Sequence, residues 1–104
     1  MKSGSIVVVS LHSPKEKIWG QLLDLTAACL TVQGLDLNSF EDWLNQIGSE
    51  DQANLMTVFY PLYRIERIAL DEIEGDIPSL EERFRQRTGR RLKEFLSDES
   101  KEGD

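Results

Sequence analysis

The sequence predicts a mainly β protein with two helices, and three observations predict it. A β-branched run opens the chain, residues 55–70 form a β-rich stretch that Pro61 interrupts once, and residues 39–47 and 79–89 carry apolar side chains at helical spacing. A chain of 104 residues is large enough for one domain with a single modest core. We therefore expect five strands, one helix inserted between strands three and four, and one C-terminal helix.

Composition and charge argue against several classes of protein. No apolar run approaches the roughly 20 residues that a membrane helix needs, and the run at 6–9 is too short for a secretory signal. Cys29 is the single cysteine of the sequence, which excludes an internal disulfide framework and a thiolate metal cluster. The net charge of -7 argues against a simple nucleic-acid binder, which needs a surplus of lysine and arginine. We expect a cytoplasmic protein that contacts no membrane.

The first three strands are expected to form a meander. The first strand is rich in β-branched side chains and ends at Ser13, because the residue before Pro14 is held extended. Gly20 suits a bulge or a strong bend in the second strand, because a residue without a side chain lets another backbone come close. Gly34 is expected to end the third strand. The strands are placed at 6–11, 18–25 and 29–33, with polar turns at 15–17 and 26–28.

A short amphipathic helix is expected next, at 39–47. Ser39 and Asp42 approximate a capping box, and Gly48 is placed to end the helix. A loop without periodicity is expected at 49–54. One face of the helix carries the apolar side chains Phe40, Trp43, Leu44 and Ile47.

Strands four and five are expected on either side of a tight bend at Pro61, which cannot donate a ladder hydrogen bond. Large side chains alternate along residues 56–60, so we expect the fourth strand to be covered on both faces. Residues 62–70 fit one helical turn followed by a strand. A continuous helix over 62–70 is the alternative, because its arginine, glutamate, leucine and alanine residues are good helix formers.

The last third of the chain is expected to be an acidic linker at 71–76, a helix and a tail. Ser79 and Glu82 form a capping box, and Gly89 is placed to end the helix. Leu92, Phe95 and Leu96 are expected to form one further turn that packs back. The charged residues 97–104 have nothing to bury, so we expect them to be disordered. The expected units are a strand domain at 1–76 with the inserted helix 39–47, a basic helical segment at 77–96 packed on it, and a tail at 97–104.

The order of elements resembles the Sm-like family, including its bacterial Hfq branch. The resemblance covers residues 6–70 and includes the bent strand with Gly20 and Leu22, the strand ending near Gly34, and the pattern at 58–68. It implies an Sm/SH3-like barrel of five strongly bent antiparallel strands. It also implies open strand edges that pair between subunits, and therefore a homo-oligomer.

The RNA-contact motifs of that family are absent from this sequence. The family carries an acidic residue and an asparagine in the turn between strands two and three, whereas residues 26–29 contain neither. The family's basic pair between the last two strands is replaced by Pro61, Leu62 and Tyr63. Residues 36–54 would be an insertion. The RNA-binding function of the family therefore cannot be transferred residue by residue.

Two groups of residues are candidates for binding. Aromatic side chains beside arginines could stack on a base or grip a peptide; these are Tyr60, Tyr63, Arg64 and Arg67, with Phe59, Trp19 and Trp43 nearby. The alternative is that the aromatic rings form core and that the tyrosine hydroxyls reach the surface. The segment 83–93 holds six basic and no acidic residues, among them Arg83, Arg87, Arg90 and Arg91. It suits an acidic protein partner, or else a solvated helix face that balances local acids.

No residue pattern predicts catalysis, a metal site or a cofactor. His12 lies near Ser10 and Ser13, but no carboxylate is placed by sequence to orient it. Cys29 suits a small core or interface residue. Acidic pairs at 41–42 and 50–51 lack the spacing of a calcium loop. We therefore expect a non-catalytic interaction or assembly module, with RNA or single-stranded nucleic-acid binding as the alternative and a hydrolase using His12 as a distant one.

Overall fold

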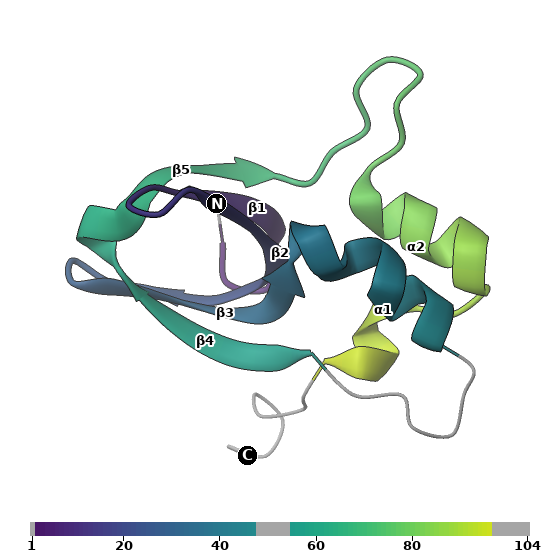
Figure 1. Cartoon of the computed structure of the whole chain (residues 1–104), viewed down its shortest axis with the longest axis horizontal. Helices are drawn as coiled ribbons and strands as arrows, with labels where there is room; N and C mark the ends of the chain where they lie inside the picture. The colour runs from purple at the N-terminus through teal and green to yellow at the C-terminus, as the bar shows by residue number, and fades with distance from the viewer. Residues whose placement is uncertain (1, 48–54, 97–104) are drawn as a thin grey trace.

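Five strands form one antiparallel sheet in the computed structural model of the chain, which describes residues 2–47 and 55–96 (Figure 1). The strands are β1 (Ile6–Leu11), β2 (Glu16–Leu25), β3 (Cys29–Asp36), β4 (Met56–Pro61) and β5 (Ile65–Leu70). The helices are α1 (Phe40–Gln46) and α2 (Leu80–Thr88), and the 3-10 turns are η1 (Leu37–Ser39), η2 (Leu62–Arg64) and η3 (Leu92–Phe95). The prediction of a mainly β protein with an inserted and a C-terminal helix is confirmed.

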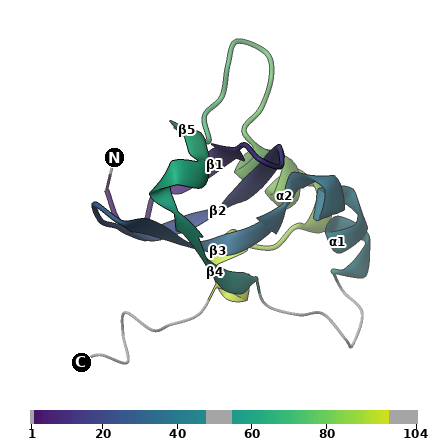
Figure 2. The same cartoon turned by 60° about the vertical axis from the view of Figure 1, so that its left-hand side comes forward.

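The sheet has the strand order β4-β3-β2-β1-β5. The first three strands form the predicted meander, β4 pairs with β3, and β5 returns to pair with β1. The two edge strands are therefore β4 and β5, which follow one another in the chain and are joined by η2. The sheet is strongly curved, and η2 forms the corner at which β4 ends and β5 begins (Figure 2). The strand ladders of the described residues do not include one between β4 and β5.

Two hydrophobic clusters lie on opposite faces of the sheet. Val7 and Val9 belong to one cluster, whereas Val8 between them packs against the other, because successive side chains of a strand point to opposite faces. The helices and η3 cover the second face (Figure 1). The first cluster comprises Val7, Val9, Leu11, Ile18, Leu22, Leu30 and Val32; the second comprises Trp19, Phe40, Trp43, Leu44, Leu55, Phe84, Leu92 and Phe95. The coverage of β1 on both faces explains the continuous apolar run at residues 6–9.

Gly20 and Gly34 lie directly opposite each other in the antiparallel pairing of β2 and β3. A Cβ on Gly20 would overlap the carbonyl of Gln33 and lie 2.6 Å from Gly34 Cα, so the close backbone approach predicted for Gly20 is confirmed. The prediction that Gly34 ends the third strand is wrong, because β3 continues to Asp36. The irregularity in β2 falls between Leu22 and Asp24 rather than at Gly20.

The inserted helix begins differently from the prediction. The side chain of Asp36 accepts a hydrogen bond from Asn38 N–H (2.8 Å) and caps η1, which leads directly into α1. Ser39 makes no side-chain cap, so the predicted capping box of Ser39 and Asp42 is wrong. The predicted stop at Gly48 and loop at 49–54 lie outside the described residues.

The structure decides two predictions for residues 55–70. One 3-10 turn followed by a strand is confirmed, and the alternative of a continuous helix is wrong. The expectation that β4 is covered on both faces is also wrong, since Phe59 is 69% exposed and Met56 is 71% exposed. Alternation showed that both faces of β4 carry large side chains, but it could not show that the helices stop short of this strand.

The C-terminal segment is tied to the sheet at several points. Asp71 accepts hydrogen bonds from Trp19 Nε1–H (3.0 Å) and from the N–H groups of Leu80 and Glu81 at the start of α2 (2.8 and 2.9 Å). Leu55 N–H donates to Phe95 O (2.9 Å), so η3 packs back as predicted.

The predicted ends of α2 are confirmed. Ser79 Oγ accepts from Glu82 N–H (3.0 Å) at the start, and Gly89 ends the helix with a φ of 71°. The predicted tail at 97–104 lies outside the described residues.

Candidate interaction surface

The outer edge of β4 carries unpaired backbone groups. Leu62 N–H donates to Ala28 O (3.0 Å) immediately beyond the β3–β4 ladder. Residues of an antiparallel strand alternate between those bonded to the neighbour and those whose N–H and C=O groups point away. This alternation directs the backbone groups of Thr57 and Phe59 away from β3, and within the described residues no other element bonds them. The middle of β4 is therefore open to another strand.

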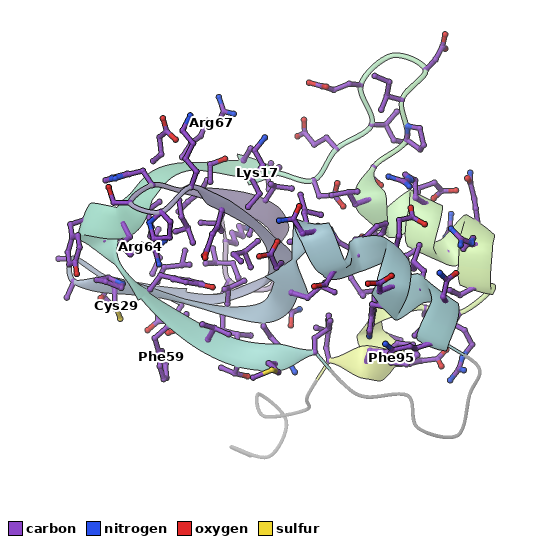
Figure 3. The ribbon with its side chains drawn as sticks, viewed as in Figure 1. Lys17, Cys29, Phe59, Arg64, Arg67 and Phe95 are labelled. Carbon is purple, nitrogen blue, oxygen red and sulfur yellow. The ribbon has the colours of Figure 1, made fainter. Side chains whose placement is uncertain are left out.

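Apolar side chains flank this open edge. Phe59 lies opposite Thr31, at a part of the sheet that the helices leave bare. Figure 3 shows Phe59 and Cys29 pointing away from the sheet on the same side. Tyr63, in η2 beside the edge, is 78% exposed. The edge of β4 thus combines free hydrogen-bonding groups with an apolar patch.

The edge of β5 has the same kind of opening. Asp71 N–H donates to Ile6 O (2.9 Å) at the end of the β1–β5 ladder. The alternation from this bond directs the backbone groups of Ile68 and Leu70 away from β1. Leu70 is 45% exposed. Both edges of the sheet can therefore accept a further strand.

The predicted aromatic and basic residues do not converge on one stacking site. Tyr60 packs against the first hydrophobic cluster, and burial, followed by the negative charge of Glu16, raises the pKa of its hydroxyl. The Arg64 guanidinium lies 5.9 Å from the Tyr60 ring centre and donates to the carbonyls of His12 (3.2 Å) and Pro14 (2.8 Å). These contacts fix the β1–β2 turn onto η2, so Arg64 has a structural role.

The other two members of that group stand apart from Tyr60 and Arg64. Tyr63 is exposed in η2. Arg67 lies on β5, the edge strand at the opposite end of the strand order from β4. There it lies opposite Ser10 of β1. Figure 3 shows Arg67 and Phe59 projecting on different sides of the molecule.

The basic segment 83–93 is largely paired with acids of this same chain. Arg83 and Arg87 both contact the Glu41 carboxylate in α1, at 2.7 and 2.9 Å, and Arg87 also donates to Asn45. Arg90 pairs with Glu94 at 2.7 Å. The first two pairs join α2 to α1. Arg91 is exposed and makes no ion pair with the described residues, and an acidic partner for the segment stays a prediction.

The residues considered for chemistry show no reactive arrangement within the described chain. His12 is exposed, and its Nδ1 lies 3.2 Å from Ser13 Oγ. Cys29 is half-buried at the start of β3. No group of three or more His, Cys, Asp or Glu side chains within residues 2–47 and 55–96 could hold a metal ion. None of the helices in those ranges has the length and hydrophobicity to cross a bilayer.

An apolar cavity of about 490 Å³ lies along the inner side of β4. Ile18, Trp43, Leu55, Val58 and Tyr60 contribute to its lining. Sequence reasoning missed this cavity, because it depends on how far β4 diverges from the neighbouring elements. The signal that could have indicated it is the alternation of Val58 and Tyr60 on one face of β4.

Comparison of the chain with protein-family models, with curated proteins and with solved structures finds no match. Function is therefore inferred from the geometry of the edges, patches and cavities.

Proposed function

We propose that this protein is a non-catalytic assembly module that folds as a small Sm/SH3-like barrel and associates with further copies through its strand edges. The strand order, the single-turn connection between β4 and β5 and the strong curvature of the sheet support the barrel. The observation that carries the assembly is the open edge of β4 beside the exposed Phe59.

Pairing with a further strand would account for both the unpaired backbone groups of β4 and the exposed Phe59 ring. A strand added to β4 would bond the outward backbone groups of Thr57 and Phe59, and it would cover the Phe59 ring. Soluble proteins commonly protect such edges with charges, prolines or bulges. Residues 56–60 contain no charged side chain and no proline, and Pro61 protects only the last position of β4. The β5 edge of a second copy is the complementary surface, because it presents free backbone groups next to Ile68 and Leu70.

Measuring the molar mass of the full-length protein in solution tests whether copies associate. We expect light scattering at high micromolar concentration to give a mass above that of the monomer. Phe59→Lys should shift the protein toward monomer, because it places a charge where the added strand would cover a ring. Thr57→Pro should do the same, because it removes a backbone N–H that points away from β3.

Ile77→Lys is the matched control. Ile77 is 66% exposed on the loop between β5 and α2, and the substitution adds the same positive charge away from the strand edges. It should leave the mass unchanged. A monomeric wild-type chain at high micromolar concentration would contradict the proposal, and so would an equal loss of mass in Ile77→Lys.

A further inference from the structure

A second cavity, of about 530 Å³, lies where β1, β2 and β5 meet η1. Ser10 lines it from β1, and the strand register places Lys17 of β2 and Arg67 of β5 on either side of Ser10. Paired residues of neighbouring strands share one face, so these three side chains form a row across the sheet. Figure 3 shows Lys17 and Arg67 projecting from the same side of the sheet.

The cations at this cavity have no ion partner within the described residues. Arg64, Arg83, Arg85, Arg87 and Arg90 all take part in ion pairs. By contrast, no ion pair or side-chain hydrogen bond within residues 2–47 and 55–96 engages Lys15, Lys17 or Arg67, and all three line the cavity. A chain with a net charge of -7 therefore gathers unpaired positive charge at one place.

Ser10 supplies a donor at the centre of the row. It is only 7% exposed, and its hydroxyl has no hydrogen-bond partner within the described residues. No buried side-chain oxygen or nitrogen atom among the described residues lacks a hydrogen-bond partner, so the unpartnered Ser10 hydroxyl is open to the cavity and can donate to a ligand atom there.

Three acids also line the cavity, and two of them are engaged. Glu16 lies 3.7 Å from Arg64, and Asp36 caps η1. Glu66, on β5, is the third. The cap leaves Asp36 charged, so Lys15, Lys17 and Arg67 face the two negative charges of Asp36 and Glu66 and leave an excess of one positive charge at the cavity.

We propose that this cavity binds a phosphate group, free or carried by a small molecule, between Lys17 and Arg67 on the hydroxyl of Ser10. A phosphate monoester carries a charge of about -1.5 to -2 near neutral pH, and its oxygens accept several charge-assisted hydrogen bonds. Two cations and a hydroxyl match that charge and that set of acceptors. The volume is within the range of small-molecule sites, so the cavity has room for an attached group.

The experiment is an NMR titration of the full-length, nitrogen-15-labelled chain with inorganic phosphate, glycerol 3-phosphate and adenosine monophosphate, against sodium chloride at matched ionic strength. We expect saturable shifts of the Ser10, Lys17 and Arg67 amides with phosphate compounds and none with chloride. Tighter binding of either monoester would identify a small-molecule ligand, and equal binding would identify the free ion.

Two variants test the residues. Lys17→Gln with Arg67→Gln should weaken binding by about tenfold or more, because both charge-assisted bonds are lost. Ser10→Ala should weaken it about threefold or more through loss of the hydroxyl donor, and it keeps the assay informative if the double variant is unstable. The matched control, Arg91→Gln with Lys93→Gln, removes two exposed cations of the C-terminal segment and should change the affinity by less than about twofold.

Shifts no larger than those caused by chloride would overturn the proposal. So would an equal loss of affinity in the control pair, or unchanged affinity in both Ser10→Ala and the double variant. A single-stranded oligonucleotide that binds more tightly than the small phosphates and shifts amides on other faces would also contradict it, and would favour nucleic-acid binding.

Discussion

At the scale of single residues, the close approach of β2 and β3 depends on Gly20 and Gly34. Their backbones approach so closely that a Cβ on either glycine would overlap the main chain of the opposite strand. Two of the neighbouring side chains are buried, Trp19 next to Gly20 and Gln33 next to Gly34. Backbone atoms cannot move aside as a flexible side chain can, so this contact restricts both positions to glycine.

Gly20→Ala is predicted to destabilise the fold by about 3 kcal/mol or more, because the added methyl group forces β2 and β3 apart in a packed core. The free energy of unfolding in urea measures this effect. Gly89→Ala is the control, since Gly89 has a left-handed φ of 71° and open space around it. It should cost only about 1 kcal/mol. Equal losses in the two variants would disprove a steric role for Gly20.

The close approach at Gly20 could be predicted from the sequence, because a glycine inside an apolar strand pattern typically marks a bulge or a close backbone contact. Gly34 was misassigned, since a glycine at the end of a strand and a glycine facing another backbone look alike in the sequence. Ser10, Lys17 and Arg67 also gave no signal as a group, because their proximity depends on the registers of two strand pairs.

At the scale of elements, α1 and α2 are joined by ion pairs that span the sequence. Glu41 in α1 receives hydrogen bonds from Arg83 and Arg87, one helical turn apart in α2. The Arg87 hydrogen bond, together with the positive charges of both arginines, outweighs slight desolvation and lowers the pKa of Glu41. The sequence indicated that the basic segment 83–93 suits an acidic partner. It could not show that one such partner, Glu41, lies more than 40 positions earlier in the same chain.

Glu41→Gln is predicted to lower stability near neutral pH but not in acid. The folded pKa of Glu41 is below its ordinary value of 4.5, so the ionised carboxylate stabilises the fold above that value, and this contribution is lost as the pH falls through the lowered pKa. Urea midpoints of wild type and variant should therefore differ at pH 7, and the difference should shrink as the pH falls below 4.5.

The control for this pH dependence is Glu72→Gln, which changes an exposed acid that makes no ion pair within the described residues. Its urea midpoint should differ less from wild type at pH 7 than that of Glu41→Gln. If the difference between Glu41→Gln and wild type were as large in acid as at neutral pH, the ion pairs would not be its cause.

At the scale of the whole molecule, the C-terminal segment 77–96 contributes buried side chains to the hydrophobic core. The Trp43 ring centre lies 5.1 Å from that of Phe84 and 5.5 Å from that of Phe95, and both phenylalanines are buried. Strand existence could be predicted from local patterns, but the order β4-β3-β2-β1-β5 could not. That order depends on pairings such as Val7 with Leu70, which no local pattern encodes.

A chain ending at residue 76 is predicted to lose cooperative folding. Removing a buried phenylalanine costs about 3 kcal/mol or more, and this truncation removes two of them together with Leu92. The whole stability of a domain is only about 5–15 kcal/mol. Tryptophan fluorescence should shift to the red, and the urea transition should broaden or disappear. A chain ending at residue 96 should unfold like the full chain, and a sharp transition of the shorter chain at the same midpoint would refute the prediction.

The pairing of β1 with β5 affects how the chain can fold while it is being synthesised. β1 leaves the ribosome well before β5, and β2 reaches it through a short turn. The other side of β1 receives its partner only when residues 65–70 have emerged. Contacts between such distant segments form late in folding, because a long loop must close first. Between the synthesis of β1 and that of β5, the nascent chain therefore exposes an unpaired valine-rich edge, which is the kind of surface that chaperones shield.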